Sequence, residues 1–334
     1  MLEFFIQYLL FFLKTITFVA AILVVLITLF ALIAKQRRNQ EDDELEINCL
    51  NEKFDNMHAA LQESILSKDE FKKWLKAKKK EDKAQEKNPA AKRLYVLDFD
   101  GDIRASAVDE LREMITAILT QATPSDEVLI KIDSGGGMVH TYGLAASQLE
   151  RLKAKKIPLT VSIDKVAASG GYLMACVANK VIAAPFSIIG SIGVIGQLPN
   201  FHRLLEKNNI DYEQHTAGEY KRTLTMFGKN TTAARAKFQE ELEETHTLFK
   251  NFVSENRPVV NIDQVATGEH WYGSQALGLK LVDEISTSDD YLLNAAKFSD
   301  IYELSYTMKK SLSEKISQAL FCCYHRTRAL LTTA

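Results

Sequence analysis

The sequence predicts an α/β fold with a largely parallel sheet, preceded by an N-terminal transmembrane helix. Two observations lead to this prediction. From residue 94 onward, short apolar stretches typical of strands alternate with longer helical stretches, as in right-handed strand-helix-strand crossovers. Ahead of them, residues 15–34 read TITFVAAILVVLITLFALIA and carry no charge. A helix of about 20 residues spans about 30 Å, the thickness of a bilayer's hydrocarbon core.

Residues 1–38 are therefore interpreted as a membrane anchor. A cleaved signal peptide is the alternative, but the apolar run is long for one and no small-residue cleavage site follows it before Lys35. Positive charges orient such a helix. Lys14 precedes the run, whereas Lys35, Arg37 and Arg38 follow it. This excess favours a cytoplasmic location for the rest of the chain.

Residues 39–92 form a charged segment in which acidic and basic residues alternate with sparse apolar ones such as Leu61 and Trp74. This pattern is typical of one or two exposed helices, and Asn88-Pro89 marks their end. A lysine run in the segment could touch anionic lipid, but a solvated helix face is the simpler explanation. The segment is therefore predicted to be a helical stalk.

A folded domain is predicted for residues 93–300. Strands are expected at LYVLDF, EVLIKID, LTVSI and KVIAAP, and helices at residues 107–121 and 140–155. The apolar segment 186–199 contains three glycines and is too short to span a bilayer, so we expect a buried strand and a loop there. Residues 301–334 follow as a basic, amphipathic C-terminal tail.

The composition argues against several kinds of function. The 334 residues carry a net charge of -2, which provides no global attraction for nucleic acid. The four cysteines, Cys49, Cys176, Cys322 and Cys323, form neither a CxxC pair nor a regular disulfide spacing. They therefore indicate no metal site and no disulfide framework.

Three places in the domain could carry chemistry, and the first is Asp98-Phe-Asp-Gly-Asp102 at the end of a strand. It resembles the nucleophile motif of haloacid-dehalogenase-type phosphatases, in which an aspartate attacks phosphorus beside a bound magnesium ion. Those enzymes usually carry threonine or valine where Asp102 stands. They also need a second acidic pair after a strand, whereas Asp289-Asp290 follows Ser-Thr-Ser. A turn between a strand and a helix explains the motif without chemistry.

The second place is Ser134-Gly-Gly-Gly137, directly after the strand EVLIKID. Consecutive glycines at the end of a strand let backbone N–H groups converge on an anion, either a phosphate or an oxyanion. The segment is not a Walker loop, because no Gly-Lys-Ser/Thr follows at the required spacing. An ordinary glycine-rich turn is the alternative.

The third place is Ser169, which lies between Ala167-Ala168 and Gly170-Gly171. These small neighbours would let a peptide carbonyl approach the hydroxyl, and the next amide could hold an oxyanion. Alternatively, the serine caps the helix that follows. A serine nucleophile needs a base, and spacing alone leaves both histidine and lysine open. The near match to Gly-x-Ser-x-Gly adds the hypothesis of an α/β-hydrolase triad with Asp263 and His270.

Four motifs follow one another along the domain: SGGGMVH from Ser134, DKVAASGGY from Asp164, GSIGV from Gly190 and AGEYKR from Ala217. In this order they resemble the membrane-bound serine peptidases of the signal peptide peptidase A family. The resemblance covers most of the chain. It implies that Ser169 is the nucleophile and Lys221 its base, with no metal or organic cofactor.

The resemblance also implies a fold, an oxyanion hole and an assembly. The expected fold is a spiral of strand-strand-helix units like that of Clp protease and the crotonases. The amides of Gly170 and Gly136 are expected to hold the oxyanion. Gly135 stands where relatives usually have proline, which leaves this loop less constrained. Relatives form rings with catalytic residues near subunit boundaries, so a homo-oligomer is expected.

The sequence thus predicts a membrane-anchored serine endopeptidase that cleaves peptides through an acyl-enzyme. Its substrates are expected to be peptides or proteins, such as signal peptide remnants or membrane-associated proteins. Apolar residues around 188–195 are expected to line the substrate groove and to favour small or hydrophobic side chains. The anchor would contact membrane lipid. The resemblance places the catalytic domain on the periplasmic side of a bacterial inner membrane, against the weaker indication from the flanking charges.

Overall fold

The structure is a computed structural model that describes residues 6, 9–19, 22–23, 44–87 and 92–308. The chain divides into two compact units, one made of residues 1–44 and 307–334 and the other of residues Leu45–Tyr306. Most of the predicted anchor run, and the tail from residue 309 onward, lie outside the described residues. Among the helices that are described, none is both long and apolar enough to cross a membrane.

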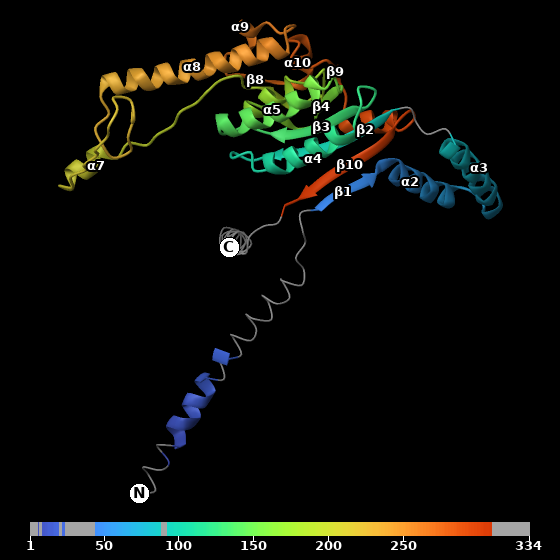
Figure 1. The fold of residues 1–334 in the computed structure, drawn as a ribbon, viewed down its shortest axis with the longest axis horizontal. Helices are drawn as coiled ribbons and strands as arrows, with labels where there is room; N and C mark the ends of the chain where they lie inside the picture. Colours follow the sequence, from blue (N-terminus) through green and yellow to red (C-terminus); the bar gives the residue numbers. More distant parts are fainter. Residues whose placement is uncertain (1–5, 7–8, 20–21, 24–43, 88–91, 309–334) are drawn as a thin grey trace. The chain divides into compact units, whose positions relative to one another are not determined.

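The larger unit is built on a mainly parallel sheet (Figure 1). In the described chain its strands follow the order β1-β10-β2-β3-β4-β6-β9, and β5, β7 and β8 continue from β3 as a separate branch. Strands β7 and β8 pair antiparallel within this branch. The strands are β1 (Glu44–Cys49), β2 (Arg93–Gly101), β3 (Glu127–Ser134), β4 (Leu159–Ile163), β5 (Val166–Ala168), β6 (Lys180–Ala183), β7 (Ile188–Gly190), β8 (His270–Tyr272), β9 (Glu284–Ile285) and β10 (Asp300–Thr307).

Helices connect most of these strands, as the alternating pattern of the sequence predicts. Those described are α2 (Leu50–Ile65), α3 (Lys68–Lys87), α4 (Val108–Gln121), α5 (Val139–Ala154), α6 (Gly170–Ala175), α7 (His202–Lys207), α8 (Thr232–Asn256), α9 (Ile262–Val265), α10 (Gly273–Gly278) and α11 (Ser288–Ala295).

The hydrophobic core occupies both faces of the central strands. Successive strand residues point to opposite faces, so Leu97 of β2 shares one cluster with Leu111 of α4. Val96 joins a second, smaller cluster with Leu50 of α2 and Leu292 of α11. Strand β4 is buried at every position, which is typical of a parallel strand covered on both faces.

The strands and helices predicted for the domain are confirmed. LYVLDF, EVLIKID, LTVSI and KVIAAP correspond to β2, β3, β4 and β6, and the two expected helices are α4 and α5. The segment 186–199 forms β7 and a loop, and α2 and α3 occupy the charged segment ahead of the domain. Strands β1 and β10 correct two predictions, because β1 lies in residues 39–92 and β10 almost entirely in residues 301–334, which were predicted to be a helical stalk and a tail, yet both strands belong to the sheet. Helix α8 was not predicted. Helix α8 buries only Val253 completely, so its sequence shows little helical periodicity in apolar residues.

Residues 191–231, which we call the arm, connect β7 to α8 and contain α7. Figure 1 shows α7 beyond the start of α8 and apart from the sheet. Contacts within the arm support it, because the rings of Phe201 and Tyr212 lie 6.0 and 5.8 Å from that of Phe227. The arm also exposes apolar side chains to solvent. They are Ile195, Leu198, Phe201, Leu204, Ile210, Tyr212, Tyr220, Met226 and Phe227.

Candidate active site around Ser169

Ser169 occupies a sharp turn between β5 and α6. Its backbone has φ +52° and ψ -118°, a conformation that costs about 1–3 kcal/mol in a residue with a side chain and that clusters at active sites. The turn is held because the Ser169 amide donates to the Gly190 carbonyl at 2.8 Å. The Ser169 carbonyl accepts from the Leu173 amide at 2.9 Å. The strain is therefore supported by hydrogen bonds on both sides of the residue.

The Ser169 hydroxyl does not cap α6, since the side chain makes no capping hydrogen bond. It has no hydrogen-bond partner elsewhere among the described residues. Ser169 thus occupies the N-cap position of α6, but its hydroxyl does not cap the helix. A half-buried hydroxyl without a partner is available to react with a substrate.

The glycine-rich loop after β3 lies directly against Ser169. Gly136 has φ +85°, and a methyl group placed on it would lie 2.7 Å from the Ser169 Cβ and 2.6 Å from the Gly170 amide nitrogen. A methyl group placed on Gly171 would likewise lie 2.6 Å from the Ser134 carbonyl oxygen. Gly136 and Gly171 therefore permit the two loops to meet beside Ser169.

Two backbone amides near Ser169 are free to bind an oxyanion. The Gly170 amide is in the first turn of α6, and neither it nor the Gly137 amide has an acceptor within the described part of the chain. Both glycines line one cavity together with Ser169. The Gly136 amide instead donates to the Ser134 hydroxyl at 3.1 Å. The resemblance implies Gly136, and the structure adds Gly137 as a second candidate because its amide has no acceptor among the described residues.

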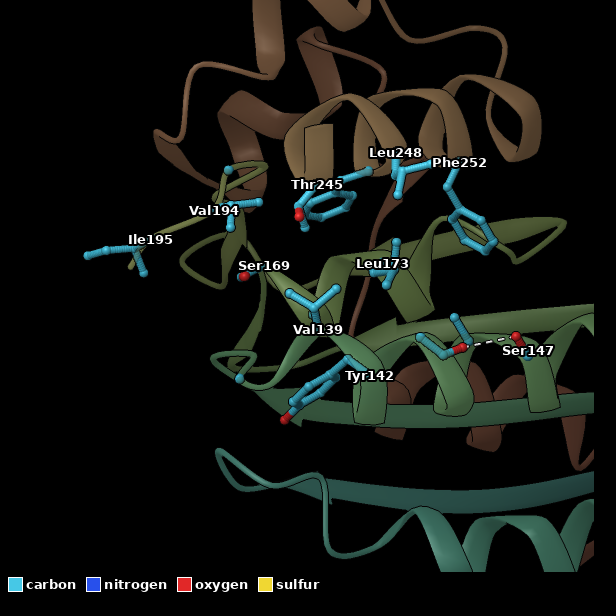
Figure 2. Close-up of a pocket in the computed structure, with 16 residues that line it drawn as sticks. Val139, Tyr142, Ser147, Ser169, Leu173, Val194, Ile195, Thr245, Leu248 and Phe252 are labelled. Carbon is cyan, nitrogen blue, oxygen red and sulfur yellow. Dashed lines mark hydrogen bonds between the residues drawn. The ribbon is translucent and has the colours of Figure 1, made fainter. Parts of the chain in front are cut away.

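The cavity beside Ser169 has a volume of about 380 Å³ and a mainly apolar lining (Figure 2). One wall is a single face of α5, whose residues Val139, Tyr142, Gly143, Ala146 and Ser147 recur at helical spacing. Residues from α6, α8 and the start of the arm complete it. These are Leu173, Gly193, Val194, Ile195, Thr245, Leu248, Phe249 and Phe252.

The sequence predicts only part of this lining. Residues 193–195 fall within the predicted groove segment, 188–195. The wall contributed by α8 was missed, although Thr245, Leu248 and Phe252 follow a spacing of three and four residues that places them on one helix face. Figure 2 shows these three side chains extending from α8 above Leu173.

The structure does not bring Lys221 to Ser169 within one chain. Lys221 lies in the part of the arm between α7 and α8, its side chain is exposed, and it is absent from the cavity lining. Its amide donates to the Gly218 carbonyl at 3.2 Å in a local turn, where Gly218 has φ +97°. The predicted nucleophile and the predicted base therefore lie on different parts of the larger unit.

The histidine alternative is not assembled at the cavity either. His270 is exposed in β8, its ring lies edge-on to Tyr272 at 6.4 Å, and Asp263 lies on the separate helix α9. No histidine of the described chain lines the cavity. His140 is exposed, and His215 lies 3.5 Å from the Glu213 carboxylate on the arm.

The Asp98–Asp102 motif has a structural place in the fold. The Asp98 carboxylate pairs with Lys131 at 2.7 Å, and the Asp102 carboxylate accepts hydrogen bonds from the amides of Arg104 and Ser106. These bonds with Ser106 and Arg104 lower the pKa of Asp102. Within the described residues, no group of three or more His, Cys, Asp or Glu side chains could hold a metal ion.

Comparison with known proteins identifies the family. Residues 3–149 match the model described as peptidase family S49 N-terminal, and residues 151–301 match peptidase family S49. The chain belongs to peptidase family S49. The resemblance to signal peptide peptidase A and its relatives is thereby confirmed, and the protein is a peptidase.

Relatives within family S49 match almost the whole chain. It is 50% identical over 322 residues to the probable protease SohB of Haemophilus influenzae, with 90% of each chain covered. It is 50% identical over 311 residues to the probable protease SohB of Buchnera aphidicola subsp. Schlechtendalia chinensis, covering 88% of this chain and 100% of that one. A solved 1510-N membrane-bound stomatin-specific protease in complex with a substrate peptide has a TM-score of 0.42 and 14% identity, over 69% and 98% of the two chains.

Proposed function

We propose that this S49 peptidase is a serine endopeptidase in which Ser169 is the nucleophile and Lys221 is the general base. The observation that carries the proposal is the arrangement at Ser169. A strained backbone presents an unpartnered hydroxyl beside the free amides of Gly137 and Gly170, at the mouth of an apolar cavity. This is the arrangement that acyl transfer to a serine requires.

In the proposed reaction, Ser169 Oγ attacks the carbonyl carbon of the scissile peptide bond while its proton passes to the neutral amine of Lys221. The carbonyl oxygen becomes an oxyanion, held by the Gly170 amide and by an amide of the loop at Gly136 and Gly137. When the carbon–nitrogen bond breaks, the lysine returns the proton to the leaving amine. Water then attacks the acyl-enzyme with the same assistance and releases the second product.

We further propose that a second copy of the chain supplies Lys221. A lysine amine accepts a proton at neutral pH only where burial disfavours its charged form, and Lys221 is exposed in the single chain. The arm that carries this lysine also exposes apolar side chains, which is typical of an interface with another subunit. Docking of the arm over a neighbouring Ser169 would bury both. A homo-oligomer accounts for these features together.

The apolar cavity supports substrates with small or hydrophobic side chains next to the cleaved bond. Signal peptide remnants and membrane-associated proteins are rich in such side chains, and we propose them as the substrate class. The uncharged run at residues 15–34 supports a single-pass anchor in a bacterial inner membrane. The resemblance to signal peptide peptidase A favours the periplasmic side for the peptidase unit, against the flanking charges.

We also propose that the domain is a Clp protease- and crotonase-like spiral. Strands β4 and β5 follow one another and precede α6, while β6 and β7 repeat the strand pair. In each pair the first strand belongs to the main sheet and the second to the branch. This alternation supports a spiral of strand-strand-helix units.

Labelling with a fluorophosphonate tests the nucleophile. The full chain should be modified at Ser169 and lose peptidase activity in proportion to the modification. Modification of a different residue, or full activity in the labelled protein, would contradict the assignment.

Mixing two inactive variants tests the second copy. Ser169→Ala retains Lys221 and Lys221→Ala retains Ser169, so a mixed oligomer contains some complete sites if the lysine comes from a neighbour. Activity should then return on mixing. Two variants that refold together and remain inactive would show that each chain uses its own lysine.

A further inference from the structure

The turn that follows β2 is fastened to the glycine-rich loop beside Ser169. The Gly101 carbonyl accepts a hydrogen bond from the Ser134 hydroxyl at 3.0 Å, at the start of the loop. The Ile103 carbonyl accepts one from the Met138 amide at 2.9 Å, at its end. A methyl group on Gly137 would lie 2.0 Å from the Ile103 carbonyl oxygen, so the two backbones are in close contact. Part of the Asp98–Asp102 motif therefore supports the active site.

Tyr142 of α5 joins this support to the nucleophile turn. Its side chain is fully buried, and its hydroxyl lies 2.5 Å from the Ser134 hydroxyl and 2.7 Å from the Asp102 carbonyl oxygen. Because the Ser134 proton points to the Gly101 carbonyl, the single Tyr142 proton serves both of these oxygens. Its ring lies behind Gly170, because a methyl group on that glycine would be 2.3 Å from the Tyr142 Cγ. One side chain thus contacts both of the loops whose amides face the reacting carbonyl.

A continuous series of hydrogen bonds runs from this hydroxyl to the glycine-rich loop. The Ser134 hydroxyl, 3% exposed as a residue, accepts from the Gly136 amide at 3.1 Å and lies next to the Tyr142 hydroxyl. Burial raises the pKa of Tyr142, with the Ser134 contact acting in the opposite direction, so the phenol remains a donor at neutral pH. Without the tyrosine hydroxyl, the Ser134 hydroxyl would still donate to the Gly101 carbonyl but would lose its hydrogen bond to α5.

We propose that Tyr142 is a positioning residue for the oxyanion hole, fixing the amides of Gly136 and Gly137 relative to the amide of Gly170. The inference rests on the proposed serine chemistry. Three consecutive glycines impose few conformational limits of their own, whereas oxyanion donors must lie within a few tenths of an ångström of the charge they stabilise. The rigid ring sets the position of the Gly170 amide. The hydroxyl, through Ser134, sets the position of the amides of Gly136 and Gly137.

The test is Tyr142→Phe in the full-length protein, which keeps the ring and removes the hydroxyl. For a short peptide ester, kcat should fall about 10- to 100-fold with KM changed less than about twofold, since the donors act mainly in the transition state. The matching thionoester provides the specific readout. Sulfur accepts hydrogen bonds weakly, so the variant should lose most of the preference that the wild type shows for the oxygen ester.

Tyr291→Phe is the matched control. That hydroxyl is also part-buried and bonds to Glu127 and Thr160, but on α11, away from the cavity. It should leave the ratio of ester to thionoester rates unchanged. Ser134→Ala should shift the ratio in the same direction as Tyr142→Phe, and the double variant should lose less than the product of the two single effects, because both residues belong to one network.

The outcomes separate this inference from the function on which it rests. Ester hydrolysis that survives Ser169→Ala would overturn the proposed chemistry and the positioning role together. Wild-type kcat and a wild-type thionoester ratio in Tyr142→Phe, in an enzyme that depends on Ser169, would overturn the positioning role alone. If Tyr142→Phe does not fold, an unchanged ratio in folded Ser134→Ala would overturn the positioning role in its place.

Discussion

The proposed nucleophile and the proposed base occupy opposite surroundings. Ser169 sits where β5, β7 and the loop after β3 meet, with its backbone amide and carbonyl both hydrogen-bonded and its neighbours buried. Lys221 sits in an exposed turn of the arm, outside the cavity. In the proposed mechanism, the hydrophobic core therefore fixes the position of Ser169, whereas activation of its hydroxyl depends on what the arm contacts. Substitutions in these two regions should differ in their effects, and the largest is expected at the nucleophile.

Ser169→Ala should abolish peptide hydrolysis, with a loss of about 10⁴-fold or more in kcat, as for other serine nucleophiles. Alanine keeps a Cβ in the same strained backbone, so the melting temperature should change little. Peptide cleavage followed by mass spectrometry measures the loss, and circular dichroism checks the fold. Retained turnover in the purified variant would remove Ser169 from the mechanism.

Lys221→Arg should reduce kcat about 10³-fold, because a guanidinium stays protonated and cannot accept the serine proton. Stability should be unchanged, since the side chain is exposed in the single chain. Lys229→Arg, on the same arm, is the control and should remain active. If both variants are fully active, the arm does not carry the base.

Gly136→Ala should lower kcat about 100-fold and also destabilise the fold. Its φ is +85°, and the new methyl would lie 2.6–2.9 Å from the Gly170 amide, the Ser169 Cβ and the Ala168 carbonyl. Gly135→Ala in the same loop has open space around its Cβ and should behave like the wild type. Equal activities of the two variants would show that the loop is not held against Ser169.

Gly143→Leu should change substrate choice about tenfold and leave the fold intact. Gly143 lines the cavity, and no atom lies within 4 Å of a Cβ built there, so a leucine side chain can extend into the space. Peptides with large apolar side chains next to the cleaved bond should be disfavoured relative to those with alanine. Gly143→Ala is the control. It should stabilise α5 by up to about 1 kcal/mol while keeping most of the wild-type preference. An unchanged preference in Gly143→Leu would mean that substrates bind elsewhere.

The smallest predicted effect is on stability and concerns Asp126, a buried residue that bonds to Arg93 at the start of β2. Burial alone would raise its pKa, but hydrogen bonds from Arg93 and Thr123 outweigh burial and lower the pKa from 3.8 to about 2. Because the folded pKa is depressed, the carboxylate contributes stability above pH 3.8 that is lost as the pH falls towards 2. The contribution should be about 2 kcal/mol.

Urea unfolding of Asp126→Asn at several pH values checks this prediction. The difference in free energy from the wild type should be largest near neutral pH and should shrink below pH 4. Asp109→Asn, which removes an exposed pair with Arg112, should show no comparable difference. If the difference in unfolding free energy between the wild type and Asp126→Asn stayed constant from pH 7 to pH 2.5, the stabilisation would not come from the lowered pKa of Asp126.

The sequence by itself determined the α/β class, most of the central strands and the identity of the proposed nucleophile. Alternating apolar and helical segments located β2, β3, β4, β6, α4 and α5, because burial against a parallel sheet leaves a local pattern in the chain. The small residues around Ser169 drew attention to this serine, and the structure shows that they also allow two backbones to approach closely. The order of four motifs was specific enough to indicate the family. These are all properties of neighbouring residues.

Only the tertiary structure decided which distant groups meet. It brought Tyr142 and the Gly101–Ile103 turn to the glycine-rich loop, closed the cavity with α8, and left Lys221 outside it. It also showed that the Gly136 amide is engaged by Ser134 while the Gly137 amide has no acceptor among the described residues. No local pattern contains this information, because hydrogen bonds and contacts between segments depend on how the strands order in the sheet. The long-range arrangement of the arm depends further on what covers its exposed apolar side chains.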